Sequence, residues 1–187
     1  VMEYQGRLYF MPRKKIKEKT EELLEFCGLI DFRRRTVRKL SGGMKRKLMV
    51  CRALLTEPEI LLLDEPTAGM DALSRRQMWN LLRQLNDHNL TILLTTHYME
   101  EAESLCQRVA FMDRGRLEEV NEPKKMVEQL GHFAVDEMTQ DGLKSHYFQN
   151  REEAIAHLSR LTGQTALRNT TLEDVFVARA EQKERQR

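Results

Sequence analysis

Two adjacent carboxylates, Asp64 and Glu65, stand directly after an apolar run in this 187-residue sequence. The run, residues 60–63, has four consecutive aliphatic side chains, which is typical of a strand buried on both faces of a parallel sheet. Ligands of such sheets gather at the carboxyl ends of the strands. Because neighbouring side chains of a strand point to opposite faces, the two carboxylates can serve different functions. One can hold a hydrated Mg²⁺ ion, while the other polarises a water molecule beside a phosphate group.

A second group of residues that could bind a ligand is Ser41-Gly42-Gly43. Ser41 is a natural N-cap, and the residues after it predict a helix because apolar side chains recur at helical spacing: Met44, Leu48, Cys51 and Leu55. The two glycines leave backbone N–H groups at the start of this helix uncovered by side chains. A helix N-terminus with free donors and a hydroxyl group attracts anions. Taken alone, the same pattern is more often a simple cap.

His97 follows a second predicted strand, Leu90–Thr95. A lone histidine is usually structural. Here, however, a parallel pairing of the two strands would place His97 at the same sheet edge as Asp64, which makes it a candidate for contact with phosphate. The other histidines have no comparable setting, and we expect them on the surface or in packing contacts: His88, His132, His146 and His157.

Apolar periodicity and turn signals predict the elements that position these groups. We expect a helix between Pro12 and Gly28, and another from Ala72 to Leu85 that contains Trp79 as a packing residue. The second half of the sequence predicts these elements: a helix at Met99–Cys106, a hairpin at Val109–Val120 that turns at Arg114-Gly115, a helix from Pro123 to near Gly131, strands at Phe133–Met138 and Leu143–Gln149 around Asp141-Gly142, a helix at Glu152–Leu161, a strand at Gln164–Leu167, and a last helix that opens at the capping box Thr171–Asp174.

Composition excludes several classes of protein. The 31 basic and 29 acidic side chains nearly balance, and the basic loop at Arg33–Lys39 lacks interleaved aromatics, so we expect no nucleic-acid partner. No apolar run approaches the roughly 20 residues that a membrane helix needs. The three cysteines, Cys27, Cys51 and Cys106, are scattered and form no C-x-x-C pattern, which favours a reduced cytosolic protein.

The segment Asp64-Glu65-Pro66-Thr67-Ala68-Gly69-Met70-Asp71 resembles the Walker B aspartate, catalytic glutamate and D-loop of ABC-type ATPases. Two adjacent acids alone would usually mark a solvated turn, but this eight-residue segment is much more specific. Ser41-Gly42-Gly43 lies 21 positions before Asp64 (64 minus 43) and is similar to the ABC signature motif. His97 is similar to the switch histidine of the same family.

The resemblance implies an α/β fold, in which a parallel sheet flanked by helices forms part of a P-loop NTPase-type ABC ATPase core. We expect residues 1–131 to be the latter part of the ATPase domain, with the helical and signature subdomain at about 1–56 and the Walker B to switch-histidine core at about 57–131. Residues 132–187 are expected to form a small α+β extension. Leu172-Glu173-Asp174-Val175-Phe176 looks like the C-terminal extension of export-type subunits.

The resemblance also implies roles for the site residues. Asp64 would support Mg²⁺, Glu65 would orient the attacking water, and His97 would contact the γ-phosphate of ATP. The signature residues, Ser41, Gly42 and Gly43, would serve an ATP molecule held by a second nucleotide-binding domain, while Asp71 would couple the two sites. The implied function is the ATP-hydrolysing subunit of an export-type ABC transporter, bound to a transmembrane permease at the cytoplasmic face of the membrane.

The sequence contains no phosphate-binding loop of the form G-x-x-x-x-G-K-[ST] and no candidate Q-loop glutamine. We therefore expect the first part of the nucleotide-binding domain to be missing, either because the sequence is partial, which we favour, or because the protein is split. The chain alone is expected to be inactive. Two other functions stay open: a non-transport ABC-type ATPase, and a non-hydrolytic interaction module that keeps the signature face.

Overall fold

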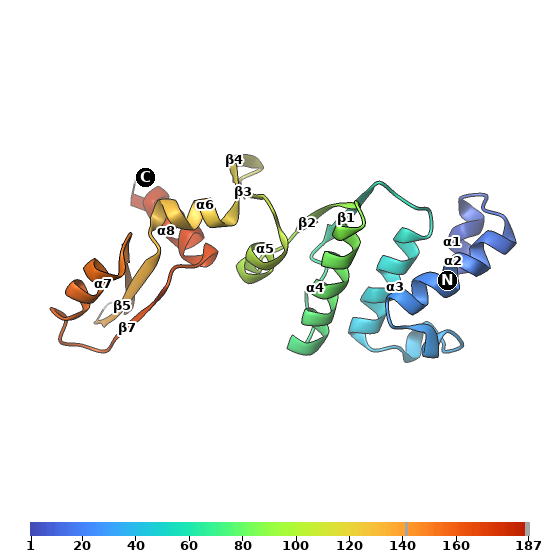
Figure 1. Ribbon diagram of the computed structural model, residues 1–187, viewed down its shortest axis with the longest axis horizontal. Coiled ribbons are helices and arrows are strands. Elements are labelled where there is room, and N and C mark those ends of the chain that lie inside the picture. Colours follow the sequence, from blue (N-terminus) through green and yellow to red (C-terminus); the bar gives the residue numbers. More distant parts are fainter. Residues whose placement is uncertain (141, 186–187) are drawn as a thin grey trace. The chain divides into compact units, whose positions relative to one another are not determined.

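A computed structural model describes residues 1–140 and 142–185 of the chain (Figure 1). The chain forms two compact units, Val1–His97 and Tyr98–Arg187, and each is described by itself. The domain division near residue 131 stays a prediction. Within the described residues, every helix is too short or too polar to cross a membrane.

The first unit combines helices with the two strands β1 and β2 (Figure 1). Its elements are α1 (Met2–Leu8), α2 (Arg13–Phe26), two short 3₁₀ helices (Ile30–Phe32 and Val37–Lys39), α3 (Gly42–Leu54), β1 (Ile60–Asp64), α4 (Ala72–Asp87) and β2 (Thr91–Thr95). The predicted helix between Pro12 and Gly28 is α2, with Pro12 as its N-cap. Gly28 follows its end with a φ of 67°, a conformation that glycine adopts without a steric penalty.

The two strands of this unit pair in parallel, with Ile60 opposite Thr91 and Asp64 opposite Thr95. Parallel strands need a crossover connection, and α4 supplies it. The buried side of α4 carries five side chains, which include Trp79 as predicted: Met78, Trp79, Leu81, Leu82 and Leu85. The strands therefore end at one edge, as the sequence predicts.

Burial of the sheet differs from the expectation that both faces are covered. Leu61 is 3% exposed, whereas Leu62 is 70% and Leu93 64% exposed. Successive side chains of a strand point to opposite faces, so one face of the sheet is packed and the other is open among the described residues of this unit. A run without polar alternation shows that both faces are apolar, but it does not show which neighbours cover them.

A pair of buried cysteines lies where α2 meets α3. The carbonyl oxygen of Leu23 accepts hydrogen bonds from the Cys27 N–H at 3.0 Å and from the Cys51 thiol at 3.5 Å. Both thiols are buried and unbridged. The shared acceptor ties the end of α2 to the middle of α3, the helix that begins at the signature residues.

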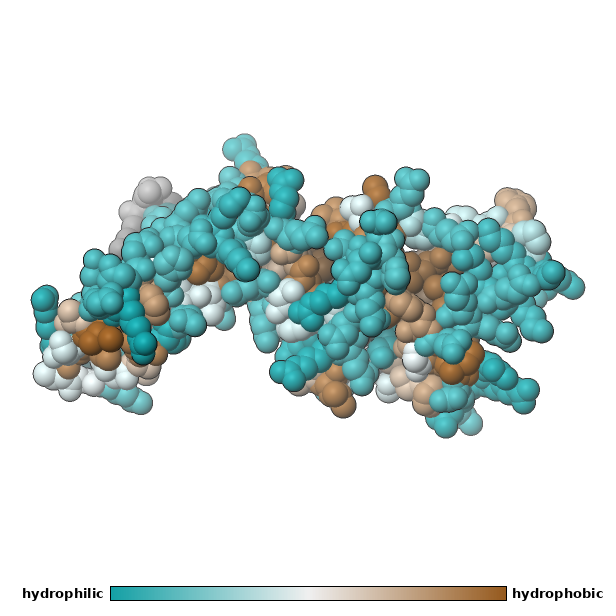
Figure 2. Space-filling model, viewed as in Figure 1, coloured by the Kyte–Doolittle hydropathy of each residue, from teal (hydrophilic) through white to brown (hydrophobic). Residues whose placement is uncertain are grey.

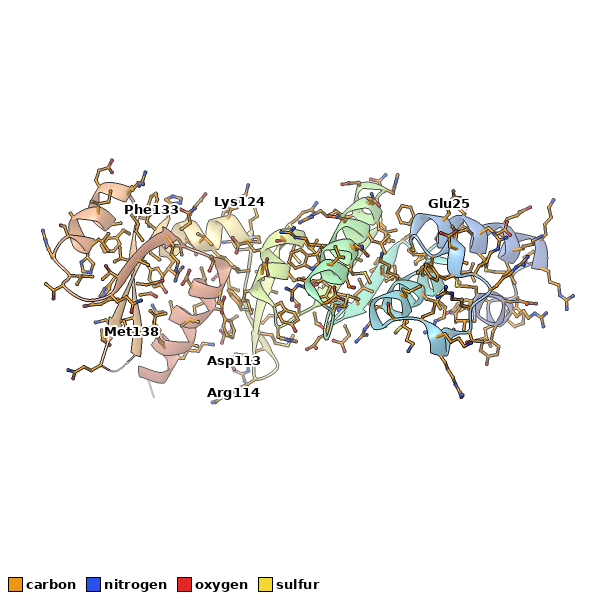
Figure 3. The ribbon with its side chains drawn as sticks, turned by 90° about the horizontal axis from the view of Figure 1, so that it is seen from below. Glu25, Asp113, Arg114, Lys124, Phe133 and Met138 are labelled. Carbon is orange, nitrogen blue, oxygen red and sulfur yellow. The ribbon has the colours of Figure 1, made fainter. Side chains whose placement is uncertain are left out.

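The second unit combines a hairpin, a three-stranded antiparallel sheet and four helices among its described residues. Its elements are α5 (Met99–Leu105), β3 (Val109–Asp113), β4 (Arg116–Asn121), α6 (Pro123–Leu130), β5 (Phe133–Thr139), β6 (Gly142–Phe148), α7 (Arg151–Leu158), β7 (Thr165–Asn169) and α8 (Leu172–Arg185). The sheet has the order β6-β5-β7, and Figure 3 shows Phe133 and Met138 along its central strand. Asp141, in one predicted turn, lies outside the described residues.

The β3–β4 hairpin turns where the sequence predicts. Arg114 and Gly115 have φ values of 46° and 77°, as a two-residue hairpin turn with positive φ at both positions requires. Figure 3 shows Asp113 and Arg114 together at this turn.

The core beneath the hairpin joins β3, α5, α6 and α8 through five buried side chains: Ala102, Phe111, Met126, Leu172 and Val175. The visible face of the unit is mainly hydrophilic (Figure 2).

Arg168 on β7 connects the sheet to the start of α8. Its guanidinium donates to Asp136 on β5 at 2.7 and 3.1 Å and to Asp174 at 2.7 and 2.8 Å. Thr171 donates to Asp174 through its N–H at 2.8 Å and its hydroxyl at 2.9 Å. Burial acts to raise the pKa of Asp174, but the bonds from Arg168 and Thr171 outweigh burial and hold this pKa below its usual value.

The open sheet face generates the first prediction. Leu61→Ala removes a buried side chain and should lower the free energy of unfolding by about 2–5 kcal/mol. Leu62→Ala changes an exposed side chain on the same strand and should change it by only about 0.5 kcal/mol. Leu62→Ala should instead reduce aggregation and the binding of a hydrophobic dye. Chemical denaturation and dye fluorescence measure both effects, and equal destabilisation by the two variants would contradict the one-sided burial.

The second prediction concerns acid and the Arg168 contacts. Because the folded-state pKa of Asp174 is depressed, its stabilisation is present above the unfolded-state pKa and is lost as pH falls through the folded-state pKa. Arg168→Met leaves the buried Asp174 carboxylate without its cation and should cost about 3 kcal/mol at pH 7. The deficit relative to wild type should shrink on acidification, because protonation removes the unpaired charge.

Denaturation of wild type and Arg168→Met between pH 7 and pH 3 measures this deficit, because the folded-state pKa of Asp174 lies below its usual value. Arg160→Met replaces an exposed arginine of the same unit and serves as the control. A deficit that stays constant with pH would show that Arg168 acts through packing alone.

Candidate functional site

Asp64 ends β1 directly opposite Thr95, the last residue of β2. The Thr95 hydroxyl donates a hydrogen bond to the Asp64 carboxylate. The carboxylate is exposed, so a ligand can approach it. A carboxylate, a hydroxyl group and water are oxygen ligands of the kind that Mg²⁺ prefers, and the residues present therefore fit a hydrated magnesium ion.

Glu65 leaves the strand in the left-handed backbone region, with a φ of 44°. Such a φ is uncommon for residues other than glycine. The β2 strand holds the conformation, because the Glu65 N–H donates to the Thr95 carbonyl at 3.0 Å and lies 3.3 Å from the Thr95 hydroxyl. Thr95 thus contacts both members of the carboxylate pair.

His97 lies beside Glu65, as expected for residues that leave parallel strands at one edge. Its Nδ1 is 3.1 Å from Glu65 Oε1. Both side chains are about half exposed, so the pair is open to water and to a phosphate group. The structure therefore brings together three of the predicted residues, Asp64, Glu65 and His97, with Thr95 between the strands.

The predicted signature residues begin α3. Ser41 is its N-cap, and its hydroxyl oxygen accepts a hydrogen bond from the Met44 N–H at 3.2 Å. A Cβ atom added at Gly42 would meet nothing within 4 Å, so the start of the helix is uncovered there. This arrangement leaves backbone donors and the dipole of a 13-residue helix facing solvent.

Asp71 caps α4 and meets the signature segment through Ser74. The Asp71 carboxylate accepts hydrogen bonds from the Ser74 hydroxyl at 2.7 Å and from the Ser74 N–H at 2.8 Å. These bonds, the hydroxyl first, hold the pKa of Asp71 below its usual value. A Cβ atom at Gly43 would lie only 3.0 Å from Ser74 Oγ and 3.1 Å from Ser74 Cβ. Ser74 therefore touches both predicted motifs.

The site thus consists of two groups, one at the sheet edge and one at the N-termini of α3 and α4. Sequence reasoning missed Thr95 and Ser74. Thr95 could have been found from the register, because a residue opposite Asp64 must end the neighbouring strand. Ser74 carries a weaker signal, since it stands three positions after a capping aspartate. Among the described residues, no three His, Cys, Asp or Glu side chains converge to hold a metal, so a magnesium site here depends on Asp64, Thr95 and water.

The chain is similar to known proteins. Residues 3–68 match the family model described as ABC transporter. The linearmycin resistance ATP-binding protein LnrL of Bacillus subtilis (strain 168) is 32% identical over 157 residues, which cover 84% of this chain and 50% of that protein. The Nod factor export ATP-binding protein I of Cupriavidus metallidurans is 38% identical over 167 residues, which cover 89% of this chain and 52% of that protein. The chain spans about half the length of the curated relatives it matches.

Solved structures resemble the chain in fold. One is an ATP-binding cassette of an ABC transporter in its ADP conformation, with a TM-score of 0.58 and 24% identity, over 64% of this chain and 46% of that one. Another is a nucleotide-free ATP-binding cassette, with a TM-score of 0.56 and 24% identity, over 59% of this chain and 44% of that one. These likenesses confirm the predicted α/β fold class.

The contact between Gly43 and Ser74 generates the third prediction. Gly42→Ala adds a methyl group in open space near a helix start and should stabilise the protein by up to about 1 kcal/mol. Gly43→Ala makes the same chemical change against Ser74 and should be less stable than Gly42→Ala by about 1–2 kcal/mol. Adding Ser74→Gly should remove the clash and restore part of the loss.

Unfolding free energies for the double-mutant cycle of Gly43→Ala and Ser74→Gly measure the coupling. We expect a coupling energy of about 1 kcal/mol that favours the double variant. Strict additivity of the two substitutions would mean that the signature segment and the Asp71 cap are not in contact.

Proposed function

This chain belongs to the ATP-binding proteins of ABC transporters, and we propose that it serves in a subunit that hydrolyses ATP to drive export through a separate transmembrane permease. The observation that carries the proposal is the meeting of Asp64, Glu65 and His97 at the edge of the β1–β2 pair. The names of the relatives, which refer to linearmycin resistance and Nod factor export, support transport out of the cell.

At the sheet edge, each residue would act by position and charge. Mg²⁺ bound with ATP would neutralise charge on the phosphates. Asp64 holds one carboxylate oxygen against Thr95 and would present the other to the hydrated ion. Glu65, fixed by its backbone bonds to Thr95, would accept a hydrogen bond from the attacking water and orient it. In the observed pairing His97 Nδ1–H donates to Glu65, so its Nε2 would donate to a phosphate oxygen when the ring is protonated.

The second group would serve a different nucleotide. The N-terminus of α3, with the Ser41 hydroxyl, the uncovered Gly42 and the neighbouring Gly43, would bind the γ-phosphate of an ATP molecule held by a second nucleotide-binding domain. Asp71, joined to Gly43 through Ser74, would transmit changes at this group to the carboxylate pair six residues before it. The proposal thus includes a dimer of ATP-binding domains at the cytoplasmic face of the membrane.

The two alternatives differ in what they require. A non-transport ABC-type ATPase would use the same residues without a permease, and the transport-related names of the relatives count against it. A non-hydrolytic module would keep only the signature group. Since these 187 residues contain no G-x-x-x-x-G-K-[ST] loop, we propose that the chain alone binds ATP weakly and hydrolyses none.

The fourth prediction separates the two groups. When this chain is paired with an intact ABC ATP-binding domain, one composite site can form, from the partner's phosphate loop and this chain's α3. Ser41→Arg places a long cation where the phosphate must approach, so ATPase activity should fall to background. Glu65→Gln alters a group that faces no bound ATP in this pairing, so activity should change less than about twofold.

In a complete protein that carries a phosphate loop next to these residues, Glu65→Gln should instead lower the ATPase rate by about 100-fold or more and leave ATP bound. Glu59→Gln, at the opposite end of β1 with an exposed side chain, is the control and should be neutral. Equal damage by Glu65→Gln and Ser41→Arg in the fragment pairing would refute the division of roles.

A further inference from the structure

Thr95 ends β2 and makes two separate contacts with the residues at the end of β1. Its hydroxyl donates a hydrogen bond to the Asp64 carboxylate, and its carbonyl oxygen accepts one from the Glu65 N–H at 3.0 Å. The two contacts come from different parts of the residue. Any amino acid at position 95 would keep the carbonyl group, whereas only threonine or serine would keep a hydroxyl group at this place.

The hydroxyl of Thr95 has a defined direction. The Glu65 N–H lies 3.3 Å from its oxygen, so this oxygen faces a donor while its own proton goes to Asp64. The contact occupies Oδ1 of the carboxylate. No donor among the residues that the structure describes reaches Oδ2. One oxygen of Asp64 is therefore held by Thr95, and the other is available to a ligand.

Packing does not fix the Asp64 side chain. Asp64 and Thr95 are exposed, and they lie on the open face of the β1–β2 pair that also carries Leu62 and Leu93. An exposed side chain can change between staggered rotamers unless a hydrogen bond holds it. Among the described residues, the Thr95 hydroxyl is thus the contact that sets the direction of this carboxylate.

The number of available carboxylate oxygens affects which divalent ion the site prefers. Ca²⁺ takes about six to eight oxygen ligands in flexible geometry and often binds both oxygens of one carboxylate. Mg²⁺ is smaller, demands near-octahedral geometry, and usually keeps several waters besides a carboxylate and substrate phosphates. Because Asp64 gives one oxygen to Thr95, it can offer only the other. That arrangement suits Mg²⁺ and disfavours the two-oxygen contact of Ca²⁺.

We propose that Thr95 is a positioning residue whose hydroxyl sets the preference of this site for Mg²⁺ over Ca²⁺, while its carbonyl holds Glu65. The inference rests on the proposed function, because phosphates of a bound nucleotide must share the ion. It goes further in assigning the choice of ion to a residue that acts through Asp64. The two contacts of Thr95 then have separate effects, one on the affinity for the ion and one on the rate of hydrolysis.

Thr95→Val separates the two contacts, since valine lacks the hydroxyl, keeps the carbonyl and suits a strand. In a complete protein that carries a phosphate loop next to these residues, the Mg²⁺ concentration that gives half-maximal ATPase activity should rise about tenfold or more. The rate at saturating Mg²⁺ should change less than about twofold, because Glu65 keeps its backbone bond to residue 95.

Binding of a fluorescent ATP analogue to the same protein gives a readout that needs no turnover. Mg²⁺ and Ca²⁺ are titrated separately, and the half-saturating concentration of Ca²⁺ divided by that of Mg²⁺ measures the preference. Thr95→Val should lower this ratio about tenfold or more. Thr95→Ser keeps a hydroxyl and should restore the wild-type ratio. Thr91→Val makes the same change at the other end of β2, at an exposed position on the same face, and should be neutral.

The outcomes distinguish this inference from the proposed function. An unchanged ratio in Thr95→Val would overturn the role of the hydroxyl while leaving the ATPase proposal intact. Equal losses in Thr95→Ser and Thr95→Val would show that position 95 acts through packing. Wild-type protein that binds the nucleotide equally well with Ca²⁺ and Mg²⁺ would also overturn the inference. Wild-type protein that binds no nucleotide with either ion would contradict the proposed function itself.

Discussion

The parallel pairing of β1 with β2 is the constraint on which the first unit depends. It brings Asp64 and Thr95, 31 positions apart, to one sheet edge. Glu65, one residue after Asp64, and His97, two residues after Thr95, therefore leave the strands at the same edge. A slip of one residue in this register would turn Asp64 to the other face of the sheet. Helix α4 makes the pairing possible, because it carries the chain from the end of β1 back to the start of β2. The same helix begins at Asp71, so the crossover also positions the cap that meets the signature segment.

Most of the elements could be predicted from the sequence because their signals are local. Ser41 caps α3, Pro12 and Gly28 bound α2, and Arg114-Gly115 forms the hairpin turn, each through the conformational preference of one or two residues. Thr95 and Ser74 could not be found in this way, because their roles arise from contacts with segments about 30 residues away. The exposure of Leu62 could not be predicted from the sequence either. An apolar side chain indicates that burial is favourable, but it does not indicate whether another element covers it.

Contacts at long sequence separation also explain the second unit. Leu172 N–H donates to Glu103 at 3.1 Å, and Lys183 pairs with Asp113 at 3.2 Å, so α8 joins segments about 70 positions earlier in the chain. Gly131, where the composition of the sequence changes, lies inside this unit. Its φ is 142°, and a Cβ atom there would lie 2.8 Å from the Phe148 carbonyl oxygen. A change in composition is visible in the sequence, whereas the close approach that requires glycine at this place is visible only once β5 and β6 are paired.

The left-handed backbone at Glu65 has a consequence for how this position evolves. Glycine or asparagine would adopt a φ of 44° at a lower conformational cost than glutamate. Selection for folding alone would therefore favour those residues, because glutamate at this position makes the protein less stable than glycine or asparagine would. A relative that had lost its catalytic role would be free to relax at this position first, while its strands and caps stayed intact. With the role proposed above for Glu65, the residue at this turn would distinguish working sites from degenerate ones among related chains.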